Sequence, residues 1–151
     1  MAEDIGLLVD RANIVDIINT VFIGTDSRRW ELVRSCFAPS VLFDMSSMGA
    51  GEPRHMTPDE IVAAWESGLK PMQAIHHQVG NYLVTVENGT ASAFCYGIAI
   101  HYLPNPTQQN TRTFVGSYDF GLEKSGDRWR ITAFKFTLKY VDGNLQLESS
   151  L

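Results

Sequence analysis

The sequence predicts an α+β fold in which three N-terminal helices pack on a strongly curved, mixed but mostly antiparallel sheet. Apolar residues recur every three or four positions up to about residue 70, and at every second position from Met72 onward. The pair Asn88-Gly89 separates two such alternating segments, which is a strong signal for a hairpin. The predicted strands are much longer than the usual five or six residues, so the sheet must coil and enclose a cone-shaped interior.

The first two helices are predicted at residues 5–25 and 27–36. In the first, an apolar stripe is formed by Leu8, Ala12, Val15, Ile18 and Phe22. Gly24 is expected to end this helix, and Pro39 to stop the second.

A third helix is predicted over residues 57–68, and its start is the clearest local signal in the chain. Thr57 can act as the N-cap, Pro58 suits the first helical position, and Glu60 can complete a capping box. The preceding residues 46–56 are rich in glycine and show no periodicity, which predicts a mobile loop.

The strands are predicted from the period-two segments and the turns between them. They lie at residues 41–43, 74–87, 90–103, 113–124 and 128–140. Glycines inside the long strands are expected to mark bulges or bends, and they are Gly80, Gly97, Gly116 and Gly121.

Composition excludes several classes of function. The formal net charge is −5 and the longest basic cluster is Arg28-Arg29, so we expect no nucleic-acid partner. We find neither a basic leader nor an apolar run of membrane-spanning length, which favours a cytoplasmic protein that does not enter membranes. Cys36 and Cys95 have no metal-ligand spacing and the chain has only four histidines, so no metal site is expected.

Four short stretches, in a fixed order, carry a family resemblance. They read TDSRRW at residues 25–30, CFAPSVLFD at 36–44, HQVGN at 77–81 leading to TA at 90–91, and VDGN at 141–144. Together they resemble the SnoaL-like branch of the nuclear transport factor 2-like superfamily, whose relatives include scytalone dehydratase, polyketide cyclases and ketosteroid isomerase. The resemblance implies one cone-shaped domain over residues 1–151.

Asp26 has two interpretations. As a residue between two predicted helices it can cap the second one through its carboxylate. The resemblance implies instead that Asp26 orients a catalytic histidine, His77, while His101 on the next strand acts as a second proton carrier or as a hydrogen-bond donor to substrate. An imidazole held by a carboxylate has a fixed tautomer and suits proton transfer near neutral pH.

The position of the histidines depends on strand register. A two-residue turn at Asn88-Gly89 predicts that paired residue numbers sum to 177, which sets His76 opposite His101 and His77 on the other face. The resemblance places His77 and His101 together in the pocket. One bulge, at Gly80 or Gly97, would reconcile the two, and we adopt this second placement.

The predicted pocket lining consists of aromatic residues that could equally be plain core, namely Phe22, Trp65, Tyr118, Phe134 and Phe136. Tyr102 or Tyr118 could donate to a substrate carbonyl. One departure from scytalone dehydratase-like enzymes is that Thr25 replaces the tyrosine that precedes the aspartate. A second expected tyrosine is also missing from residues 45–56, which argues against scytalone itself as substrate.

The predicted function is a cofactor-independent lyase or isomerase that carries out dehydration, double-bond isomerisation or cyclisation. The ligand would be a small apolar molecule of polycyclic, steroid-like or polyketide-like type. The alternative is a non-catalytic binding or dimeric assembly module of the same fold. A homodimer is expected through the open sheet face, because a row containing Phe94, Tyr96 and Ile98 or their odd-numbered neighbours needs cover.

Overall fold

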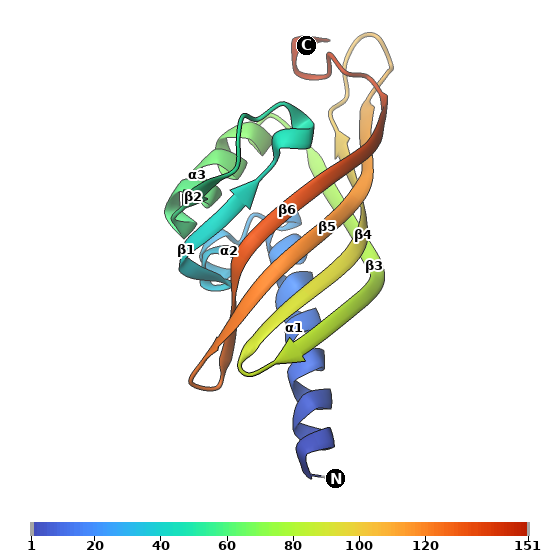
Figure 1. The fold of residues 1–151 in the computed structure, drawn as a ribbon. Coiled ribbons are helices and arrows are strands. Elements are labelled where there is room, and N and C mark those ends of the chain that lie inside the picture. Colours follow the sequence, from blue (N-terminus) through green and yellow to red (C-terminus); the bar gives the residue numbers. More distant parts are fainter. Residues whose placement is uncertain (1, 151) are drawn as a thin grey trace.

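The computed structural model describes residues 2–150 and confirms the α+β prediction (Figure 1). The helices are α1 (Ala2–Asp26), α2 (Trp30–Ser35) and α3 (Pro58–Leu69), with short 3-10 turns η1 (Ser46–Met48) and η2 (Glu148–Ser150). The strands are β1 (Phe37–Asp44), β2 (Arg54–Met56), β3 (Ala74–Glu87), β4 (Thr90–Tyr102), β5 (Thr111–Ser125) and β6 (Arg128–Gly143). They form one sheet in the order β2-β1-β6-β5-β4-β3, in which only the β1–β6 pair is parallel.

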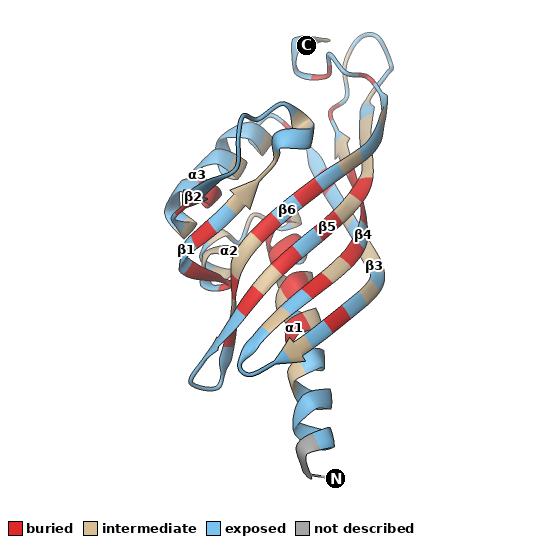
Figure 2. Ribbon diagram, in the orientation of Figure 1, coloured by how far each residue is buried: buried red, intermediate tan, exposed pale blue. Residues whose placement is uncertain are grey.

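The long strands β3 to β6 curve together, and α1 lies against one face of the sheet while α2 and α3 lie beside β1 (Figure 1). Residues 4–12 of α1 extend beyond the sheet and are mostly exposed (Figure 2). The predicted stripe is therefore wrong at Leu8 and Ala12, which face solvent. It is correct at Ile18 and Phe22, which are buried.

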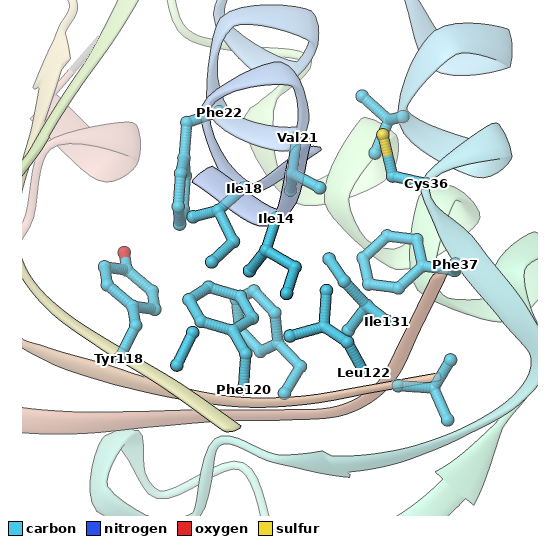
Figure 3. Packing of buried hydrophobic residues seen from close by; sticks show 14 of the residues in the cluster. Ile14, Ile18, Val21, Phe22, Cys36, Phe37, Tyr118, Phe120, Leu122 and Ile131 are labelled. Carbon is cyan, nitrogen blue, oxygen red and sulfur yellow. The ribbon is translucent and has the colours of Figure 1, made fainter. Parts of the chain in front are cut away.

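The core forms between α1 and the concave face of the sheet. In Figure 3, Ile14, Ile18 and Phe22 of α1 point toward side chains of the long strands, among them Phe120 and Leu122. Most of these side chains are less than 5% exposed, so α1 is fixed firmly at its C-terminal end. This end of α1 carries Asp26.

Several predicted boundaries are wrong; Pro39, for example, was expected to stop the second helix, but α2 ends at Ser35 and Pro39 lies inside β1. Helix α1 does not end at Gly24 but continues to Asp26. Gly24 serves close packing instead, because a Cβ at this position would lie 2.8 Å from Cγ2 of Val33 on α2. The segment 46–56, predicted as a mobile loop, contains η1 and strand β2, which pairs with β1.

The predicted capping box of α3 is confirmed. The hydroxyl of Thr57 accepts a hydrogen bond from the backbone N–H of Glu60 at 3.2 Å. In return, the carboxylate of Glu60 accepts from the backbone N–H of Thr57 at 2.8 Å. This reciprocal pair satisfies two N–H groups at the helix start and fixes the helix that forms one wall of the site.

A β-bulge in β3 determines which histidine faces inward. Near the turn, paired residues of β3 and β4 follow the expected register, as in Leu83↔Phe94. Asn81 and Tyr82 then face the single residue Cys95, and Asn81 takes a left-handed conformation with φ of 59°. The bulge expected at Gly80 or Gly97 is thus confirmed, immediately after Gly80.

Beyond the bulge, the register of β3 shifts by one residue. His77 now pairs with Ala99, and His76 pairs with Ile100. Because paired residues share a face and side chains alternate along a strand, His77, Ala99 and His101 lie on the same, inner face. The simple register that set His76 opposite His101 is wrong, and His76 is exposed on the outer face.

The strand glycines have different roles. Gly116 and Gly121 lie at register shifts between β5 and β6, as predicted. Gly97 lies at no register shift, so the prediction of a bulge at this residue is wrong. A Cβ on Gly97 would lie only 2.2 Å from Cε2 of Tyr118, so glycine is needed here to make room for that ring.

Candidate functional site

A cavity of about 250 Å³ opens between the inner face of the sheet, the C-terminal end of α1, α3 and η1. Its walls are formed by Phe22, Thr25, Met45, Met48, Ala64, Trp65, Gly68, Leu69, His77, Ala99, His101, Phe114, Tyr118, Phe134 and Phe136. All five aromatic residues expected around a pocket are in this set, together with both candidate histidines. Most of the wall is hydrocarbon, so a few polar atoms dominate the chemistry of the cavity.

Asp26 lies behind His77 and holds it by two hydrogen bonds. The backbone N–H of His77 donates to Oδ2 of Asp26 at 2.8 Å, and Nδ1 of the imidazole lies 2.6 Å from Oδ1. Both side chains are largely buried, with 19% and 12% of their surfaces exposed. The N-cap interpretation of Asp26 is wrong, since Arg29 precedes α2 and no side chain caps that helix.

This contact fixes the proton on the His77 ring. A carboxylate at Nδ1 accepts a hydrogen bond, so the neutral imidazole carries its proton on Nδ1 and a lone pair on Nε2. No hydrogen bond to Nε2 is formed within residues 2–150, and the ring lies in the cavity wall against Phe22, with 5.1 Å between ring centroids. In its neutral form, His77 can therefore accept a proton only at Nε2.

At His101 the partner of Nδ1 is a hydrogen-bond donor, whereas at His77 it is an acceptor. Nη2 of Arg112 lies 3.0 Å from Nδ1 of His101, and Arg112 is itself paired with both carboxylate oxygens of Glu148, at 2.7 and 3.0 Å. Burial, followed by the nearby charge of Arg112, lowers the pKa of His101 to about 4. His101 is therefore neutral near pH 7.

The sequence did not predict Arg112 and Glu148. The last strand hairpin was expected to begin at residue 113, which left Arg112 outside the sheet, whereas the ladder pairs it directly with His101. Extending the predicted strand by one residue would have included Arg112, which lies opposite His101 in the ladder. Glu148 lies beyond the strands in η2, where no periodic signal exists.

The two tyrosines considered as donors differ. Tyr118 is buried in the cavity wall between Phe22 and Phe136, each at 4.8 Å between ring centroids. Burial raises the pKa of its phenol, so Tyr118 stays protonated and can donate. Tyr102 is exposed and does not line the cavity.

The described residues do not form a metal site, since no three His, Cys, Asp or Glu side chains among them converge. Helices long and apolar enough to cross a membrane are likewise absent from the part of the chain described. Among the residues that line the cavity, the polar side chains are those of His77, His101, Tyr118, Thr25 and Trp65.

Sequence comparison matches residues 7–135 to the SnoaL-like domain. The chain belongs to the SnoaL-like domain family. The match includes the Asp26–His77 pair and ends within β6, so it contains all residues of the cavity wall except Phe136. No curated protein matches this SnoaL-like chain significantly.

Solved structures share the fold at low sequence identity. A protein of Kribbella flavida superposes with a TM-score of 0.86 at 23% identity, covering 90% of this chain and 95% of its own. A type 2 hexachlorocyclohexane dehydrochlorinase gives 0.80 at 17% identity, with 93% of each chain covered. A candidate scytalone dehydratase of Novosphingobium aromaticivorans gives 0.79 at 13% identity, with 91% and 89% covered. These similarities establish the nuclear transport factor 2-like fold of this SnoaL-like protein.

Proposed function

We propose that this SnoaL-like protein is a cofactor-independent lyase or isomerase in which Nε2 of His77 is the general base. The observation that carries this proposal is the bidentate contact of Asp26 with the backbone and ring of His77 in the wall of an apolar cavity. Two structural neighbours are named for a dehydrochlorinase and a dehydratase, which are both elimination activities, and this favours the lyase.

In this mechanism, Nε2 of His77 removes a proton from a substrate carbon, and the electron pair of that C–H bond forms a double bond. In an elimination, the leaving group departs with its own electron pair. In an isomerisation, the same imidazolium returns the proton to another carbon. Asp26 stabilises the imidazolium that forms, and a positioned base of this kind contributes about 10²–10⁴-fold in rate.

The cavity favours small substrates. Ligand pockets commonly enclose roughly 300–1,000 Å³, and this one encloses about 250 Å³. Among the ligand classes predicted from sequence, a compound of one or two rings therefore fits better than a four-ring steroid. Trp65, Phe134 and Phe136 would contact its apolar surface and exclude water during proton transfer.

The histidine doublet offers a matched test. His77→Gln removes the proposed base, whereas His76→Gln changes a neighbouring exposed imidazole on the outer face. The assay incubates a panel of small ring ketones and halogenated or hydroxylated ring compounds in D2O, and follows product formation and deuterium uptake at carbon. We expect wild type and His76→Gln to be active and His77→Gln to lose at least about 100-fold. Equal activity in all three proteins would refute the assignment of the base.

The alternative function is ligand binding without turnover. It is favoured if wild type binds small ring compounds in calorimetry but shows no exchange or product with any of them. Because this outcome needs only the apolar walls, binding by His77→Gln would then equal that of wild type.

A homodimer through the outer sheet face is part of this proposal. The even-numbered row of β4 faces outward, and it leaves Tyr96 46% and Ile98 40% exposed. Phe94 packs against Tyr96 in the same row. Light scattering after size exclusion should give twice the chain mass for wild type and one chain mass for Ile98→Glu. A wild-type monomer would refute the dimer.

A further inference from the structure

The hydrogen bonds of His101 restrict what this residue can do. Its Nδ1 lies 3.0 Å from Nη2 of Arg112, a guanidinium that can only donate. Nδ1 must therefore be the acceptor and carry the lone pair, which leaves the proton of the neutral ring on Nε2. A protonated ring would turn a second N–H toward the guanidinium at this distance, so the contact disfavours the imidazolium.

Arg112 is fixed in turn by two contacts. Glu148 accepts from both terminal nitrogens of Arg112, and the guanidinium also lies over the ring of Phe114 at 5.3 Å. The C-terminal segment that supplies Glu148 is anchored by Leu147, which is fully buried against Met72, Ile75 and Leu103. The chain Glu148–Arg112–His101 thus has little freedom to rearrange.

We propose that Arg112, held by Glu148, is a positioning residue that fixes His101 as a permanent hydrogen-bond donor through Nε2–H, so that the substrate must present an acceptor oxygen beside the carbon deprotonated by His77. This rests on the proposed function. The class that meets both requirements is a small ring compound with a carbonyl group next to the acidic C–H.

The electrostatics of the site agree with this role. The groups that act on His101 are Arg112 and Glu148 on one side and His77 and Asp26 on the other, and burial is the largest influence on its pKa. His77 and His101 are diagonal neighbours on adjacent strands, a relation that typically sets two residues about 7–8 Å apart across the sheet. One small substrate can bridge the two rings, with its C–H at the base and its oxygen at the donor. Negative charge that develops on this oxygen is then met by a donor already in place.

This arrangement decides between the two roles that the sequence left open for His101. A second proton carrier must gain a proton at one nitrogen and release it at another. Here Nδ1 is occupied by Arg112, and loss of the Nε2 proton would leave an anionic ring. His101 therefore binds the developing charge while His77 moves the proton.

The first test needs no substrate. Two-bond ¹H–¹⁵N NMR correlations on the full chain report the tautomer of each histidine. We expect His101 of wild type to be neutral with its proton on Nε2 at pH 7, and Arg112→Met to show a mixture of tautomers. A charged His101 at pH 7, a proton on Nδ1, or an unchanged tautomer in Arg112→Met would overturn the proposal.

The second test is kinetic and uses Arg34 as the control. Arg34 is also held by two carboxylates, Glu31 and Asp59, but it lies outside the cavity wall. With a cyclic ketone that the wild type turns over, we expect Arg112→Met to lower kcat about 10–100-fold with little change in KM. This is less than the roughly 10²–10³-fold loss expected when a direct oxyanion donor is removed. Arg112→Lys should recover part of this loss, because an ammonium can still donate to Nδ1.

The outcomes distinguish a failure of the positioning role of Arg112 from a failure of the proposed role of His77 as the base. An equal fall of kcat in Arg112→Met and Arg34→Met, or no fall in Arg112→Met, overturns the positioning role even if His77 proves to be the base. Retained activity in His77→Gln refutes the proposed function, while the NMR result on His101 still decides the tautomer.

Discussion

Replacing Gly97 by alanine is expected to destabilise the protein by displacing Tyr118. The new Cβ would lie 2.2 Å from Cε2 and 2.8 Å from Cδ2 of that ring. Carbon atoms in contact normally stay about 3.5–4.0 Å apart, so the ring must move by about 1.5 Å. Phe22 and Phe136, each 4.8 Å away between centroids, leave it no space except the cavity.

The expected cost follows from this geometry. Overpacking a well-filled core costs about 1–3 kcal/mol, and the close approach here places Gly97→Ala at the upper end. For a chain of this size, 1 kcal/mol lowers Tm by about 2–4 °C, so we expect a decrease of about 6–12 °C. The displaced ring would also reduce the volume open to ligand.

Differential scanning calorimetry and urea unfolding measure the effect, with Gly80→Ala as control. A Cβ on Gly80 meets nothing within 4 Å, so that variant should stay within about 0.5 kcal/mol of wild type. In a Tyr118→Leu background the cost of Gly97→Ala should fall below about 1 kcal/mol, because the clashing ring is gone. A Gly97→Ala protein that melts within 2 °C of wild type would refute the reasoning.

Three further predictions concern the site and its support. Asp26→Asn places an amide N–H against Nδ1 of His77, which moves the ring proton to Nε2; turnover should fall about 10²–10⁴-fold in steady-state assays while ligand affinity in calorimetry changes only a few-fold. For His101, with a folded-state pKa of about 4 against about 6.5 when unfolded, the unfolded chain binds the extra proton between these values. Stability should therefore fall by up to about 3 kcal/mol as pH decreases from 6.5 to 4, and urea unfolding of His101→Gln should lack this share. Thr57→Ala removes the capping box, and thermal melts should show a loss of about 1 kcal/mol that Thr57→Ser largely avoids.

The element types were predictable because their signals are local. The capping box at Thr57 involves residues three positions apart, and the Asn88-Gly89 turn adopts positive φ at both positions, as its composition predicts. Boundaries failed where tertiary contacts decide them. Gly24 looked like a helix end, but it is a glycine because Val33 of the next helix packs against it.

The site was predictable only in part. The pairing of Asp26 with His77 came from family resemblance, since no periodicity connects a helix end with a strand so distant in sequence. The exact phase of β3 depends on a bulge where Tyr82 leaves the ladder register and donates a hydrogen bond to Asn19 of α1. Such a contact between separate elements leaves no local pattern. The same holds for Glu148 and Arg112, which meet only after the sheet has formed.

The bulge after Gly80 has a consequence for the paired histidines. Deletion of one residue between His77 and the bulge, such as Gln78, would shift every earlier residue of β3 by one position relative to β4. His76 would then stand opposite Ala99, in the place next to Asp26, while every pair from the bulge to the turn stayed unchanged. A one-residue shift would thus replace the imidazole of His77 by that of His76. The strand could therefore lose a residue here and still have a histidine opposite Ala99.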